Sequence, residues 1–174
     1  LYEGLFRDGL YHGEGTLFRG NGSKYISGKW VFGKPHGPVQ FYFPDNGLLQ
    51  YEGGLKKMDD GSFVFQGQGT LYNQTGQSVY QGLWEDGTRS GNGTAWLEDG
   101  SIYSGNWVDD YPDGKGTYLF PDGTEYEGGF IRGKKHGQGT FKEADGFVSY
   151  DGEWKDGQRF GRGRVNKRDS SSYE

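Results

Sequence analysis

The sequence predicts an all-β fold: an elongated, twisted antiparallel meander sheet of about seven stacked β-hairpins. Three observations support this prediction. Glycine accounts for 35 of the 174 residues and aromatic residues for 17% of them, and glycine costs a helix about 1 kcal/mol per residue. A short motif, Y-x-G-x-W with Phe or Leu in place of Trp, recurs along the chain. Asp-Gly pairs between the motifs favour the positive φ angles of tight hairpin turns.

The Y-x-G-x-W motif predicts the first strand of each repeat. The repeats begin near residues 2, 26, 51, 80, 103, 126 and 150. Six of the seven motifs begin with Tyr, and the second has Ile26 in that position. Because alternate residues of a strand share one face, the Tyr, Gly and Trp of a motif point the same way.

A second motif, G-x-G, predicts the second strand of each hairpin. It occurs in six units, for example at Gly114 and Gly116, whereas the second unit ends in Val39 instead. The third unit has about five extra residues near Met58. Since an isolated hairpin is marginally stable in water, we expect the units to stack and bury their aromatic residues.

The repeat resembles the MORN (membrane occupation and recognition nexus) family. The stretches that begin at Tyr126 (YEGGFIRGKKHGQGTFKEADG) and Tyr2 (YEGLFRDGLYHGEGTLFRGNG) carry the pattern residue by residue, and the similarity extends over about residues 1–165. The departures lie in the second and third units and are expected to distort the groove locally. The resemblance implies a rod-like sheet with a concave, aromatic-lined groove, and non-catalytic work as a scaffold at membranes or the cytoskeleton.

We therefore expect a non-enzymatic scaffold or adaptor that holds a partner protein segment, as a helix or an extended peptide, in the aromatic groove. Aromatic residues dominate interface hot spots, and a row of them suits an amphipathic helix. The expected groove residues are Tyr2, Phe6, Trp30, Tyr51, Tyr80, Trp84, Tyr103, Trp107, Tyr126, Phe130, Tyr150 and Trp154. An acidic block in residues 79–127 would then select basic flanks of the partner.

Two alternatives remain open. A basic cluster near the end of the chain predicts a membrane-surface tether that binds phosphoinositides, since each cation near an anionic membrane contributes about 1 kcal/mol. Its residues are Lys155, Arg159, Arg162, Arg164, Lys167 and Arg168. The second alternative is an accessory module of a larger enzyme, because Leu1 lies directly beside the first motif. The expected location is cytoplasmic, at membrane or cytoskeletal structures.

The sequence offers no catalytic, metal or cofactor site. Cysteine is absent. His12, His36 and His136 occupy equivalent repeat positions, which stacking would place ~10 Å apart, too far for shared metal coordination. The G-x-x-x-x-G-K stretch that ends at Lys134 lacks the Ser or Thr and the helix of a phosphate-binding loop. The net charge of −5 disfavours nucleic acid as a partner.

The domain prediction is a single repeat domain over residues 1–165, followed by a flexible tail over residues 166–174. An open sheet leaves two edges that proteins must cover or pair. We therefore also expect a homodimer through an end repeat.

Overall fold

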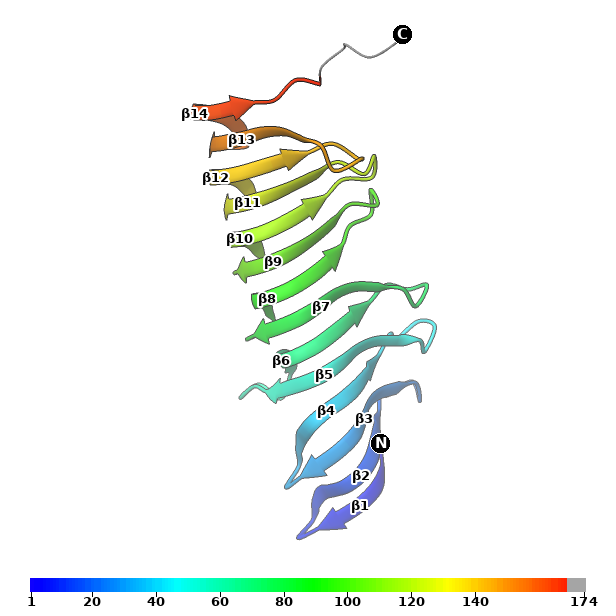
Figure 1. Cartoon of the computed structure of the whole chain (residues 1–174). Coiled ribbons are helices and arrows are strands. Elements are labelled where there is room, and N and C mark those ends of the chain that lie inside the picture. The colour runs from blue at the N-terminus through cyan, green and yellow to red at the C-terminus, as the bar shows by residue number, and fades with distance from the viewer. Residues whose placement is uncertain (169–174) are drawn as a thin grey trace. The chain divides into compact units, whose positions relative to one another are not determined.

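The computed structural model describes residues 1–168, which form 14 β-strands and no helix. The strands follow chain order in one open antiparallel meander, so each strand is hydrogen-bonded to its sequence neighbours (Figure 1). This confirms the all-β prediction of about seven hairpins. Residues 169–174, which belong to the predicted flexible tail, lie outside the described residues.

The chain divides into two compact units between Gly93 and Thr94. The first unit contains β1 (Tyr2–Arg7), β2 (Leu10–Phe18), β3 (Lys24–Val31), β4 (Lys34–Tyr42), β5 (Leu49–Lys57), β6 (Phe63–Tyr72), β7 (Ser78–Glu85) and most of β8 (Thr88–Trp96). The second contains the end of β8, β9 (Ile102–Val108), β10 (Tyr111–Leu119), β11 (Glu125–Ile131), β12 (Lys134–Lys142), β13 (Val148–Lys155) and β14 (Gln158–Val165). The single domain over residues 1–165 stays a prediction.

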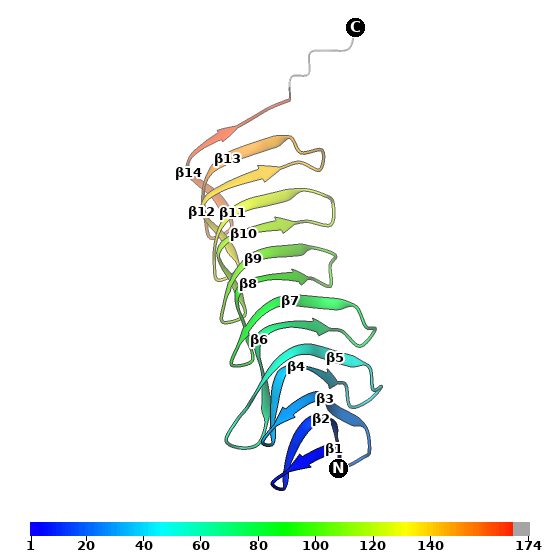
Figure 2. The same ribbon diagram turned by 60° about the horizontal axis from the view of Figure 1, so that its bottom comes forward.

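Two backbone devices shape each hairpin. The turn between β13 and β14 uses Asp156 at φ 51° and Gly157 at φ 88°, the left-handed pair that a tight hairpin requires. The first glycine of G-x-G, Gly67 in β6, has φ 72° and lies where the register shifts between β5 and β6. Such bulges bend a strand, and Figure 2 shows the strands of both units curving along their length.

The other motif glycines make room for the tyrosine ring. Gly53 and Gly69 pair directly across β5 and β6, and the Tyr51 ring lies over them. A Cβ atom on Gly69 would come within 2.1 Å of the Tyr51 hydroxyl oxygen. Gly93 beside Tyr80 and Gly139 beside Tyr126 show the same close approach, so the two motifs depend on each other.

The buried rings join successive hairpins. The Tyr51 ring meets Trp84 of the next hairpin edge-on, with centroids 5.9 Å apart, and Tyr126 meets Trp154 in the same way at 5.1 Å. The Trp154 indole Nε1 donates a hydrogen bond to the Gly139 carbonyl oxygen at 2.9 Å, and Trp84 reaches the equivalent carbonyl of Gly69. The core of each unit is therefore a ladder of interlocked aromatic rings.

The second hairpin fills its core with aliphatic residues in place of the tyrosine ring and the glycine. Val39 takes the position of the second G-x-G glycine and pairs with Gly28, while Ile26 replaces the motif tyrosine. Ile26 and Val39 are both buried, at 0% and 1% exposed. In the other hairpins a tyrosine ring lies over the second glycine of G-x-G. Ile26 is too short to do so, and the Val39 side chain fills the space that the ring would occupy.

Candidate functional site

The sheet of each unit has two chemically different faces. The ring face carries the motif Tyr and Trp side chains, and the polar face carries the residues that alternate with them. In β13, for example, Tyr150, Gly152 and Trp154 belong to the ring face, whereas Asp151 and Glu153 belong to the polar face. A partner that binds an aromatic surface would have to approach the ring face.

The structure buries nearly all the aromatic residues that the sequence assigned to a groove. Eleven of the 12 are at most 8% exposed, and only Phe6 is open to solvent, at 58%. Intramolecular contacts cover the eleven rings, so a ligand on this face would meet the residues above them. Whether the ring face binds a partner stays a prediction.

A further row of residues, which the sequence analysis missed, covers the buried rings. We call it the stacking row: in each hairpin it is the residue two positions before the G-x-G motif. Tyr11 stacks on Tyr2 at 4.0 Å between ring centroids, and Phe65 stacks on Tyr51 at 3.9 Å. The row consists of Tyr11, Pro35, Phe65, Arg89, Pro112, Lys135 and Arg159. Six of the seven are half-buried and Arg159 is exposed, so this row contributes accessible surface to the ring face.

The stacking row changes its chemistry between the two units. Its first three members are aromatic or aliphatic, and Arg89 follows, with its guanidinium carbon 5.8 Å from the centre of the Tyr80 ring. In the second unit two of the three members are cations. The Arg159 guanidinium carbon lies 4.6 Å from the centre of the Tyr150 ring, a cation–π geometry.

Lys135 lies within a cluster of four aromatic rings. Its Nζ atom lies between 4.8 and 5.1 Å from the centres of four rings, those of Phe120, Tyr126, Phe141 and Trp154. Burial, together with the nearby positive charge of Arg159, lowers the pKa of Lys135 from its ordinary value. The rings stabilise the cation in place of water, because their faces carry partial negative charge.

The motif tyrosines use their hydroxyl groups for structure. The hydroxyl of Tyr126 donates to the Gly129 carbonyl oxygen at 2.9 Å, and Tyr51, Tyr103 and Tyr150 each donate to the carbonyl three residues further on. Burial raises the pKa of Tyr126 to about 12. These hydroxyls are engaged and hard to ionise, which does not suit general acid or base chemistry near neutral pH.

The basic residues expected to bind lipid do not share one face. Arg159 lies on the ring face opposite Trp154, whereas Arg164 lies on the polar face opposite Asp151. Arg168 forms an ion pair with Asp145. The basic residues are therefore divided between two faces of the sheet. Whether they bind lipid stays a prediction.

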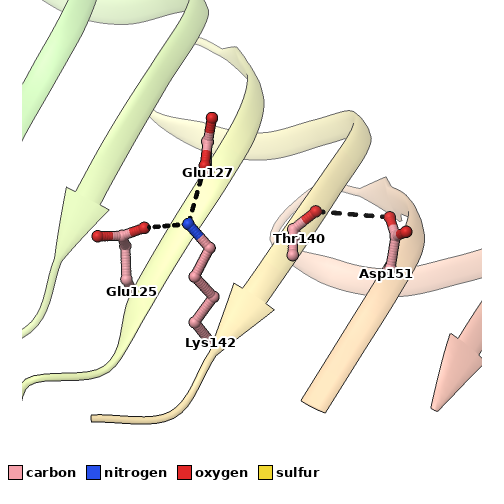
Figure 3. Close-up of polar contacts among 5 residues, drawn as sticks. All are labelled: Glu125, Glu127, Thr140, Lys142 and Asp151. Atoms are coloured by element: carbon pink, nitrogen blue, oxygen red, sulfur yellow. Dashed lines mark hydrogen bonds and ion pairs between the residues drawn. The ribbon is translucent and has the colours of Figure 1, made fainter. Parts of the chain in front are cut away.

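Two members of the acidic block of residues 79–127 lie on the polar face. In β11, Glu125 and Glu127 occupy the polar face and contact the Lys142 ammonium at 2.7 and 3.0 Å (Figure 3). The two hydrogen bonds raise the pKa of Lys142. On the same face the Thr140 hydroxyl lies 3.5 Å from a carboxylate oxygen of Asp151 (Figure 3).

Within residues 1–168, no three His, Asp or Glu side chains are grouped as metal ligands would be. Over the same residues, no helix is long and apolar enough to cross a membrane.

Comparison with known protein families identifies the repeat. A family model described as MORN repeat matches residues 2–24, 27–48, 80–102, 103–125, 126–147 and 150–165, which together make up more than half of the chain. The third hairpin, formed by β5 and β6, is not among the matched segments. A search of curated proteins finds no match.

Proposed function

The chain belongs to the MORN repeat family, and from this premise we propose that it is a non-enzymatic scaffold whose ring face binds a partner polypeptide. Repeats of this family are interaction modules for proteins and membranes. The observation that carries the proposal is the stacking row, a line of accessible aromatic, proline and cationic residues above a buried aromatic ladder. Aromatic residues and arginine are the residue types enriched at interface hot spots.

The spacing of the stacking row suits a polypeptide. Equivalent residues of successive hairpins lie two strands apart, about 10 Å on the sheet. Residues seven apart in an α-helix share one face and also lie about 10 Å apart along the helix axis, and residues three apart in an extended polyproline II peptide share one face about 9 Å apart. A helix or a peptide laid across the strands of one unit would therefore meet the row at regular intervals.

The test exchanges one stacking residue for another that the chain itself uses. Phe65→Arg places in β6 the residue type found at Arg89 and Arg159, so the fold should tolerate it. Gln68→Arg adds the same charge to the same strand on the opposite face and serves as the matched control. Both variants are first checked for unchanged circular dichroism and melting temperature.

The readout is photo-crosslinking in cells of the source organism, followed by mass spectrometry. We expect the yield of at least one crosslinked protein to fall about tenfold or more with Phe65→Arg and to stay unchanged with Gln68→Arg. Identical crosslinked sets for the two variants would contradict the proposal.

The membrane tether remains the second proposal, supported by the exposure of every residue of β14, three of which are arginines. Vesicles that contain phosphoinositides should then float with the protein at physiological salt and release it at high salt, because exposed charges are screened. Absence of flotation would contradict it. The role of an accessory module of a larger enzyme and a cytoplasmic location beside membranes or the cytoskeleton are likewise proposals.

A further inference from the structure

Two cations occupy the ring face of the second unit with no carboxylate to neutralise them. Lys135 and Arg159 are consecutive members of the stacking row: the Lys135 ammonium lies 4.9 Å from the centre of the Trp154 ring, and Arg159 pairs with Trp154 across β13 and β14. Among residues 1–168 neither side chain forms an ion pair. Their mutual repulsion contributes to the lowered pKa of Lys135. The pair is thus an uncompensated positive site that an anion would stabilise.

The part of this face around Lys135 and Arg159, formed by strands β11 to β14, supplies no negative charge. In strands β11 to β14, the other residues that share the face of the motif tyrosines are glycine or apolar, with no Asp or Glu among them. The nearest carboxylates along the same strands, Asp151 and Glu153, project from the polar face. An acidic ligand on these strands would therefore meet two attractive charges, whereas Asp113 of β10, whose charge raises the pKa of Tyr103, lies outside them.

We propose that the ring face of the second unit binds an acidic polypeptide segment, with carboxylate side chains contacting Lys135 and Arg159 and apolar side chains lying beside them. This deepens the proposed function and rests on it. It differs from the expectation that acidic residues of the chain select a basic partner, which stays a prediction; two of those residues, Glu125 and Glu127, contact Lys142 on the polar face.

The positions of the two cations favour a peptide over a lipid surface. Consecutive stacking residues lie about 10 Å apart, which matches acidic residues seven apart on a helix. A membrane attracts cations that face one plane together, whereas Arg162 and Arg164 of β14 alternate away from Arg159 onto the polar face. A guanidinium and an ammonium above aromatic rings also offer apolar surface beside each charge.

The experiment is a heteronuclear NMR titration of the full 174-residue chain with synthetic amphipathic peptides of about 20 residues. One peptide carries Glu and Leu along one face, and two others carry Gln or Lys in place of Glu. We expect the Glu peptide to bind about tenfold more tightly than the Gln peptide. It should shift the Trp154 indole resonance and the backbone resonances of β12 to β14.

Two double variants test which cations matter. Lys135→Gln with Arg159→Gln should abolish the preference for the Glu peptide. Arg162→Gln with Arg164→Gln removes the same charge from the polar face of β14 and should preserve that preference. Lys135→Arg with Arg159→Lys keeps both charges and shows whether a loss reflects charge or folding, with melting temperatures measured for all three.

Several results of the titration would overturn the inference. Equal affinity for the Glu, Gln and Lys peptides on the ring face would remove the acidic selectivity and leave the proposed function standing. No shift at millimolar Glu peptide would overturn the inference, and shifts confined to the polar face would contradict the proposed function as well. A third outcome concerns membranes. If the unaltered chain binds vesicles but none of the peptides, and Lys135→Gln with Arg159→Gln abolishes the vesicle binding, the two cations bind a membrane and not a polypeptide.

Discussion

Replacing Gly69 by Ala tests the packing rule on which the repeat depends. The Cβ of the new side chain would lie 2.1 Å from the Tyr51 hydroxyl oxygen and 2.4 and 2.5 Å from two ring carbons. Tyr51 is 0% exposed, and its ring stacks on Phe65 and touches Trp84. The ring therefore cannot move aside without separating contacts on both sides.

The magnitude follows from what a displaced ring would lose. Overpacking a core typically costs about 1–3 kcal/mol, and exposing an aromatic side chain of this size costs about 1.5–3 kcal/mol. The hydrogen bond from the Tyr51 hydroxyl to the Gly54 carbonyl contributes about 1 kcal/mol more. Because the first two costs partly replace each other, we expect Gly69→Ala to lower the free energy of unfolding by about 3–5 kcal/mol.

The assay is urea denaturation followed by tryptophan fluorescence, with hydrogen exchange to locate the loss in β5 to β7. Gly67→Ala is the matched control: a Cβ there has no atom within 4 Å, and its only cost is the positive φ of 72°. That strain is worth about 1–2 kcal/mol. A second control is Tyr51→Leu, which removes the ring and should make the added Gly69→Ala nearly neutral.

Either of two results would refute this reasoning. Equal destabilisation by Gly69→Ala and Gly67→Ala would mean that backbone freedom, not ring clearance, explains the glycine. Additive effects of Tyr51→Leu and Gly69→Ala would show that the two positions are not coupled, since coupled neighbours are non-additive.

Three further predictions concern the second hairpin, the tyrosines and the sheet edge. Ile26→Tyr alone should destabilise the chain because the tyrosine ring would meet the Val39 side chain. Adding Val39→Gly should restore the melting temperature. A double variant that melts as low as Ile26→Tyr would contradict the idea that Ile26 and Val39 compensate for each other. Burial raises the pKa of Tyr126 above its ordinary value near 10 to about 12, so stability is complete below pH 10 and falls between about pH 10 and 12. Tyrosinate absorbance should rise together with unfolding, and ionisation near pH 10 in a folded protein would contradict this. Phe160 and Val165 of β14 are 54% and 57% exposed, so light scattering should detect concentration-dependent self-association that Lys at both positions reduces; a monomer at high concentration would contradict it.

The fold could be predicted because its determinants are local. Each Y-x-G-x-W strand pairs with the G-x-G strand that follows it, and the turn residues between them set the hairpin. The pairing of Gly128 with Gly139, and of Gly139 with Gly152, repeats from hairpin to hairpin. A period in the sequence therefore translates directly into strand order.

The exposure of the aromatic rings could not be predicted from the same pattern. Strand alternation predicts on which face of the sheet Tyr51 or Trp84 lies, but it does not predict which residues cover that face. The covering residue comes from another part of the hairpin, as Phe65 covers Tyr51. Its position is visible in the sequence as the residue two before G-x-G, but its identity varies among aromatic, proline and basic side chains, so no single letter marks it.

That variation is what allows one scaffold to present different chemistry. The ring ladder fixes the tyrosine, the tryptophan and the glycines, because each contacts the others inside the sheet. The stacking residue needs only a flat or extended side chain that can lie on a tyrosine ring, a condition that Phe65, Arg89 and Lys135 all meet. It is therefore the position on the ring face where a repeat can change what it binds without losing its fold.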